Sequence, residues 1–235
     1  GSIDHHIDSE NVSALRVMFY NVENFFDTFD DPAITDDEFS ATGEKKWSEY
    51  RYTKKLNNIA KTIIAVGGWE PPAIIGLCEI ENFQVLLDLT SKTMLQKYGY
   101  QIIHENSKDL RGIDNALLFR SDNLKLLSHK SIPIPLEGNA PTRDILYARC
   151  LLMNGDTIHF FVNHWPSRIG GKDLTEHKRM LAGQVLKKQT DSLIRLNPKA
   201  KLFIMGDFND DPNDNSLTQA LGVNMDSDEK DHRYL

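Results

Sequence analysis

Asp207 and Asn209 stand two positions apart directly after the apolar run 202–205, and their side chains could act together on one reactant. Side chains two positions apart on an extended chain point the same way. The carboxylate could orient or deprotonate a water molecule, and the amide could hold that carboxylate or an anionic oxygen. A plain turn is one competing interpretation, because Gly-Asp-x-Asn often forms one. A calcium loop is a second, but Pro212 stands where that loop requires glycine and Thr218 where it requires glutamate.

Three further apolar runs end in polar residues of the same kinds. The run 15–20 ends in Asn21, the run 73–78 ends in Glu79, and the run 158–162 ends in Asn163 and His164. Each ending has an ordinary explanation: a strand-end turn for Asn21, a helix-opening acid pair for Glu79 with Glu81, and a packed surface histidine for His164. Together, the four endings predict a polar site at one rim of a sheet core.

The intervening segments supply the elements that would position this site. Periodicity predicts helices over 48–66, 82–98 and 173–196, with Ser48 as a cap and Met94 turned inward. Predicted strands are 100–104, 116–120, 124–128 and 145–152, and Asn154-Gly155-Asp156 predicts a hairpin turn before the strand that carries His164. Helices between the early strands, followed by consecutive strands, favour a mixed α/β layer protein.

Composition limits the size and environment of the fold. With 235 residues and 40% hydrophobic content, the chain can bury one core, so we expect a single domain over 15–235 after a flexible lead-in at 1–14. The acidic segment 27–46 favours a solvated loop over a second metal site. No apolar run is long enough to span a bilayer. Cys78 and Cys150 lie in apolar runs and are expected to be buried free thiols.

The ordered set of motifs resembles the endonuclease/exonuclease/phosphatase superfamily, which includes deoxyribonuclease I and exonuclease III. The resemblance spans nearly all of 15–221. Its motifs, in the family's order, are Tyr20-Asn21-Val22-Glu23-Asn24, Cys78-Glu79-Ile80-Glu81-Asn82, Arg111-Gly112-Ile113-Asp114-Asn115-Ala116, Pro141-Thr142-Arg143-Asp144, Asn163-His164-Trp165-Pro166-Ser167-Arg168 and Gly206-Asp207-Phe208-Asn209.

The resemblance implies the fold and the metal. It implies two mixed β-sheets packed face to face and flanked by helices, a four-layer α/β/β/α sandwich. It also implies Mg²⁺ bound by Glu79 with help from Asn21, with Mn²⁺ or Ca²⁺ as alternative ions.

The resemblance also assigns roles to the remaining site residues. Asp207, oriented by Asn209, would position or deprotonate the attacking water, and His164 would donate to a phosphate oxygen. The residues expected to bind substrate are Arg143, Arg168 and Asp114, although a turn former is the alternative for Asp114.

One family motif is not matched. The family normally closes with a Ser-Asp-His motif whose histidine is the principal acid or base, and only Asp231-His232-Arg233 imitates it. We therefore expect the domain to be C-terminally truncated.

The predicted function is a metal-dependent phosphodiesterase of the nuclease type. A net charge of −7 argues against broad coating of nucleic acid, but a local basic rim of Arg143, Arg168, Lys172 and Lys178 would suffice to steer a phosphate. The alternatives are a phosphatase or phosphodiesterase acting on inositol phosphates or lipid headgroups, and an incomplete fragment that binds metal or phosphate without turnover. We expect a monomer, either exported with its signal peptide removed or cytoplasmic.

Overall fold

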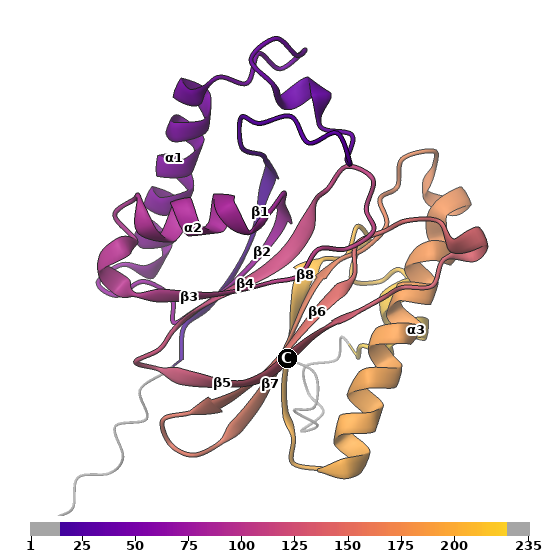
Figure 1. Cartoon of the computed structure of the whole chain (residues 1–235). Helices are drawn as coiled ribbons and strands as arrows, with labels where there is room; N and C mark the ends of the chain where they lie inside the picture. Colours follow the sequence, from indigo (N-terminus) through magenta and orange to yellow (C-terminus); the bar gives the residue numbers. More distant parts are fainter. Residues whose placement is uncertain (1–14, 225–235) are drawn as a thin grey trace, which may run out of the picture.

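Two four-stranded β-sheets face each other between helical layers (Figure 1). The computed structural model describes residues 15–224. The first sheet has the order β1-β2-β4-β3 and the second β5-β6-β7-β8. Their strands are β1 (Val17–Phe25), β2 (Ile74–Ile80), β3 (Tyr100–His104), β4 (Asp114–Arg120), β5 (Leu124–Ile132), β6 (Ile145–Leu152), β7 (Thr157–His164) and β8 (Lys201–Asp207). The predicted four-layer sandwich is confirmed.

The helices cover the two outer faces. Helices α1 (Glu49–Gly67) and α2 (Phe83–Ser91) lie on the first sheet, and α3 (Lys172–Leu196) lies on the second (Figure 1). The short helical segments are η1 (Asp37–Phe39), η2 (Gln96–Tyr98), η3 (Glu137–Asn139) and η4 (Ser216–Leu221). No described helix has both the length and the apolar character needed to cross a membrane.

Three apolar cores separate the four layers. One lies between α1, α2 and the first sheet, around Leu56, Ile63 and Leu77. The second lies between the sheets, around Ile74, Leu117 and Phe160. The third lies under α3. Strand β2 is buried on both faces, as its continuous apolar sequence predicts.

Two parallel strand pairs bring the polar strand ends to one edge. Strand β1 runs parallel to β2, with α1 as the crossover, and β7 runs parallel to β8, with α3 as the crossover. The carboxyl ends of parallel strands meet at the same edge of a sheet. Strands β1 and β8 are therefore the neighbouring edge strands that carry Asn21 and Asp207.

Several predicted boundaries differ from the structure. The helix predicted over 82–98 ends at Ser91, so Met94 lies outside it and is 47% exposed instead of facing inward. Strand β5 continues beyond 128 to Ile132 because its pairing with β6 continues through a bulge. Ser48 occupies the cap position of α1 without a capping hydrogen bond, whereas the Asn82 side chain accepts one from Val85 N. Cys78 and Cys150 are free and buried, as predicted.

Candidate active site

The amide of Asn21 joins two carboxylates at the edge between the sheets. Its Nδ2 donates to Glu79 Oε1 and to Asp207 Oδ2, each at 3.1 Å. These oxygens share one donor, so they lie no further apart than twice that distance. The structure therefore brings together three of the predicted residues, one each from β1, β2 and β8.

A β-bulge turns Glu79 out of the sheet. The pairing of β2 with both of its neighbours shifts register at this residue, and Glu79 has a positive φ of 65°. Glu23 and Asn24 on β1 also have positive φ, at 55° and 57°. This paired distortion lets Asn24 N donate to Glu79 Oε2 at 2.7 Å. Bulges and strained backbone of this kind cluster at functional sites because they re-aim side chains.

A close approach of two strands fixes the Asp207 end of β8. Gly206 has a φ of 156°, and a Cβ at this position would lie 2.3 Å from the carbonyl oxygen of Asn163 on β7. Only glycine fits this contact. Beyond it, Asn209 N donates to Asp207 Oδ1 at 3.0 Å, and Asn209 Nδ2 donates to the Trp165 carbonyl at 2.9 Å. Asp207 is thus oriented by Asn21 and by the backbone of Asn209.

His164 lies beside Glu79 and is held neutral. Its Nε2 is 3.9 Å from Glu79 Oε1, and its side chain is 4% exposed. Burial, reinforced by the guanidinium groups of Arg143 and Arg111, lowers the pKa of His164 to about 2. A neutral imidazole can donate one hydrogen bond to an anion, but it holds no proton to release as an acid.

The oxygen-rich donor set fits a hard divalent cation. Within residues 15–224, no Lys or Arg forms an ion pair with Glu79 or Asp207. No three His, Cys, Asp or Glu side chains converge as a metal site in that range. A cation here would therefore take at most two carboxylates, with water completing its shell, because Asn21 turns Nδ2 toward both carboxylates while its Oδ1 accepts from Glu23 N at 2.9 Å. Mg²⁺ binds in this manner, since it keeps several waters and few protein ligands.

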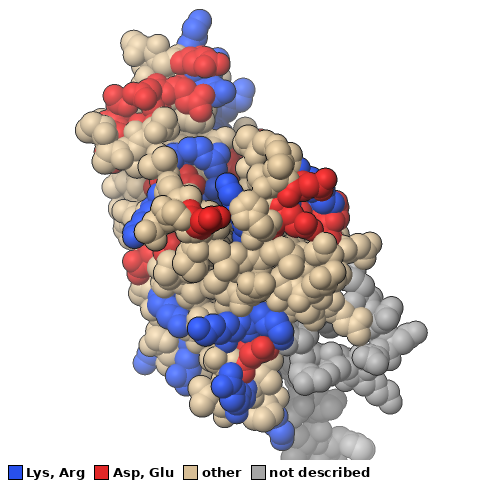
Figure 2. All heavy atoms as spheres, turned by 90° about the vertical axis from the view of Figure 1, so that its right-hand side faces the viewer, with Lys and Arg blue, Asp and Glu red and all other residues tan. Residues whose placement is uncertain are grey.

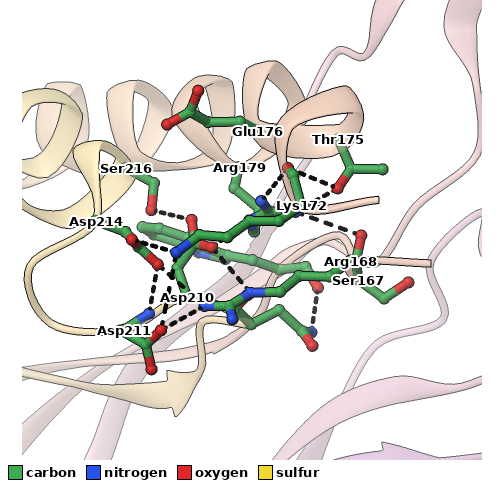
Figure 3. Close-up of polar contacts among 12 residues, drawn as sticks. Ser167, Arg168, Lys172, Thr175, Glu176, Arg179, Asp210, Asp211, Asp214 and Ser216 are labelled. Atoms are coloured by element: carbon green, nitrogen blue, oxygen red, sulfur yellow. Dashed lines mark hydrogen bonds and ion pairs between the residues drawn. The ribbon is translucent and has the colours of Figure 1, made fainter. Parts of the chain in front are cut away.

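Two residues of the predicted basic rim, Arg168 and Lys172, pair with aspartates, and the substrate-binding role of Arg168 stays a prediction. Arg168 contacts Asp210, Asp211 and Asp214 at 3.2, 3.1 and 3.0 Å, and Lys172 lies 2.6 Å from Asp214 (Figure 3). Arg168 Nε also donates to the Asn209 carbonyl at 2.6 Å. Arg179 also pairs with Asp210, at 2.7 Å, so three cations meet three aspartates and this cluster carries no excess positive charge.

The side of the molecule on which α3 lies carries charges of both signs (Figure 2). On the face drawn in Figure 2, Lys and Arg in the upper part lie beside Asp and Glu, whereas Lys and Arg gather in the lower part.

A cavity of about 490 Å³ opens at the candidate site, and its walls include Asn21, Arg168, Asp207 and Asn209. The cavity therefore combines the Asn21 amide and the Asp207 carboxylate with a neutralised arginine, whereas Glu79 and His164 are not among its lining residues.

Two other predicted residues are buried away from this cavity's walls. Arg143 is 6% exposed and donates to Asp109 Oδ2 at 3.0 Å and to the Trp165 carbonyl at 2.7 Å. Asp114 is 3% exposed, accepts a hydrogen bond from Ser107 N, and lies 3.8 Å from His104. The substrate-binding roles of Arg143 and Asp114 stay predictions.

Sequence reasoning missed the partners that hold these residues. Asp109 and Lys55 belong to no motif, and Trp165 takes part through its backbone carbonyl, so only spatial contact identifies these partners. Lys55 Nζ donates to the Glu23 carbonyl and, at 3.2 Å, to the Asn24 carbonyl. The imitation motif Asp231-His232-Arg233 and the lead-in 1–14 lie outside the described residues.

Solved structures share this fold at low sequence identity. The catalytic domain of human Nocturnin with bound sulfate is 19% identical, with a TM-score of 0.59 over 86% of this chain and 66% of that one. Humanized D. rerio TDP2 is 15% identical, with a TM-score of 0.57 over 90% and 68%. A Bacteroides thetaiotaomicron mannosyl-6-phosphatase is 18% identical, with a TM-score of 0.62 over 88% and 70%. The chain thus spans about two thirds of the length of these proteins.

Comparison by sequence gives the family directly. A search of curated proteins returned no match. The endonuclease/exonuclease/phosphatase family, whose members hydrolyse phosphate esters, matches residues 16–235. Because that match covers nearly the whole sequence and agrees with the four-layer sandwich, the chain belongs to the endonuclease/exonuclease/phosphatase family.

Proposed function

We propose that this protein is a divalent-metal-dependent phosphodiesterase of the nuclease type. The observation that carries the proposal is the single amide of Asn21 between the carboxylates of Glu79 and Asp207. Hydrolysis of a phosphodiester needs neutralised phosphoryl oxygens and a water held in line for attack. The carboxylates of Glu79 and Asp207, which form no ion pair with Lys or Arg among the described residues, lie near the neutral His164 and support both requirements.

The residues divide between holding a cation and handling water. Glu79 would bind Mg²⁺, with the Asn21 amide beside it, and the bound ion would neutralise charge on the phosphate. Asp207 would accept the proton of the attacking water, while Asn209 holds that carboxylate through its backbone N–H. Neutral His164 would donate a hydrogen bond to a nonbridging phosphoryl oxygen.

Hydrolysis of bis(p-nitrophenyl) phosphate tests this function. We expect turnover with Mg²⁺ or Mn²⁺ and none with EDTA. Asp207→Ala and Glu79→Gln should abolish it, whereas Asp211→Ala, which removes an exposed carboxylate of the same loop, should not. Equal turnover by all three variants would refute the site assignment.

Two further arms separate the alternatives. The likeness in fold to a mannosyl-6-phosphatase makes a phosphomonoesterase the second candidate, and faster hydrolysis of p-nitrophenyl phosphate than of the diester would favour it. Mn²⁺ binding without turnover of either ester would identify a noncatalytic binding protein. The single domain over 15–235, the monomeric state and the compartment stay predictions.

A further inference from the structure

A second cavity lies on the opposite face of β1 from Asn21. It has a volume of about 350 Å³, and its walls include Tyr20, Trp47, Arg51, Lys54 and Lys55. Successive strand residues point to opposite faces, so Tyr20 lines this cavity whereas Phe19 and Asn21 line the candidate active site. The two cavities thus flank the end of one strand.

The cations of this cavity are not neutralised. Arg51, Lys54 and Lys55 form no ion pair with any carboxylate among residues 15–224, in contrast to Arg168 and Lys172. Arg51 donates instead to the Lys45 carbonyl, and Lys55 donates to the carbonyls of Glu23 and Asn24. Glu23 is the one carboxylate among the described residues that line the cavity. Three cations against one acid leave a local excess of positive charge in a protein of net charge −7.

The cavity is coupled to the active site through one turn of backbone. Lys55 holds the carbonyl of Asn24, and Asn24 N donates to Glu79 at 2.7 Å. Consecutive residues of β1 line the two cavities, Phe19 and Asn21 the first and Tyr20 and Val22 the second, so one strand separates them. A substrate with several phosphates along one chain can therefore occupy both.

We infer that the cavity formed by Trp47, Arg51, Lys54 and Lys55 binds a phosphate of a polynucleotide strand next to the one being cleaved. This inference rests on the proposed phosphodiesterase function and specifies its substrate class. A small phosphomonoester would leave the cavity unused, whereas a nucleic acid strand carries a charge at each nucleotide that Lys and Arg neutralise. Lysine acts here as a mobile point charge, and arginine as a planar donor.

Lys54→Ala, with Lys61→Ala as its control, tests the inference. Lys61 lies on the same helix seven residues on, about 10.5 Å along the axis, and it is exposed outside the cavity. The ligands are short fluorescein-labelled DNA and RNA oligonucleotides, with pyrophosphate as competitor. Binding is measured by fluorescence polarisation in EDTA, and turnover is measured with Mg²⁺ on an oligonucleotide and on bis(p-nitrophenyl) phosphate.

We expect Lys54→Ala to raise Kd and KM for an oligonucleotide about fivefold. The slope of log Kd against log salt should fall by about one in magnitude, as for loss of one phosphate contact. Hydrolysis of bis(p-nitrophenyl) phosphate should be unchanged, and Lys61→Ala should behave like the parent in every assay.

Three results would overturn the inference. Equal effects of Lys54→Ala and Lys61→Ala would show general surface attraction. An equal loss on the small diester would show that the substitution disturbs the active site instead of a separate subsite. Pyrophosphate binding that Lys54→Ala weakens, with oligonucleotide binding unchanged, would show a phosphate site that polynucleotides do not use. If no ester is hydrolysed, the proposed function fails, but the polarisation assay in EDTA still decides what the cavity binds.

Discussion

The Nδ2 of Asn21 lies 3.1 Å from Oδ2 of Asp207, although the two residues are 186 positions apart in the sequence. The same nitrogen reaches Glu79. One amide thus sets the spacing of two carboxylates that would otherwise repel each other, and it does so across the boundary between the two sheets.

Asn21→Ala should lower turnover and metal affinity by about 10- to 100-fold, the usual effect of removing a group that orients a metal ligand. Without the amide, the direct link between Glu79 and Asp207 is lost, and each carboxylate keeps only a backbone donor, Asn24 N or Asn209 N. Turnover of bis(p-nitrophenyl) phosphate and Mn²⁺ titration would measure the loss. Asn57→Ala serves as control, because that amide donates to the Thr53 carbonyl of its own helix. Full activity in Asn21→Ala would contradict the bridging role.

Asp210→Ala should lower the free energy of unfolding by about 3 to 5 kcal/mol, because it leaves a buried guanidinium unpaired. Arg179 and Asp210 are 0% and 1% exposed, with Nε and Oδ1 2.7 Å apart. The neighbouring Asp211 is 70% exposed, so Asp211→Ala should cost at most about 1 kcal/mol. Urea unfolding of the two variants gives the comparison. Similar values for both would mean that the buried pair does not stabilise the fold.

Arg168→Ala should lower kcat about tenfold and change KM less than twofold. Its guanidinium holds the Asn209 carbonyl and three aspartates, so we expect it to position Asn209 without contacting substrate. Steady-state kinetics separates the two parameters. Lys178→Ala removes a cation of the same predicted rim and should change neither. A rise in KM alone would instead support the contact between Arg168 and a substrate phosphate that the sequence predicts.

His104→Gln and Asp114→Asn should reveal opposite pH dependences of stability that cancel in the parent protein. Burial raises the pKa of Asp114 from 3.8 to about 6 and lowers the pKa of His104 from 6.5 to about 4. Between these values the folded pair holds one proton on Asp114, whereas the unfolded pair holds one on His104. Because the folded and unfolded states bind equal numbers of protons, this pair gives the free energy of unfolding no dependence on pH in this range.

Each variant removes one side of this balance. In His104→Gln the folded state binds more protons, so the free energy of unfolding should fall as pH rises from about 4 to 6. In Asp114→Asn the unfolded state binds more protons, so the free energy of unfolding should rise as pH rises from about 4 to 6.5. Either slope is at most about 1.4 kcal/mol per pH unit. Urea unfolding across this range measures both, and parallel profiles for the two variants would refute the assignment.

The strand ends could be predicted from sequence because local periodicity encodes them. Apolar runs that stop at Asn21, Glu79 and Asp207 predict strands, and the parallel topology then places their tips at one edge. The partners of the arginines could not be predicted. Arg168 was expected to meet phosphate, but the loop that follows β8 folds back and surrounds it with aspartates. Such pairing depends on loop conformation, which periodicity does not encode.

The order of the strands has a consequence for the nascent chain. Residues 17–120 contain the whole of the first sheet, and its partner requires residues 124–207. At roughly 5–20 residues per second, a ribosome needs about 4 to 17 seconds to make the second sheet. During that interval the inner face of the first sheet, with Ile74, Leu117 and Phe119, has nothing to cover it. The N-terminal half then exposes apolar surface that can aggregate, and the carboxylate pair does not exist until Asp207 is made.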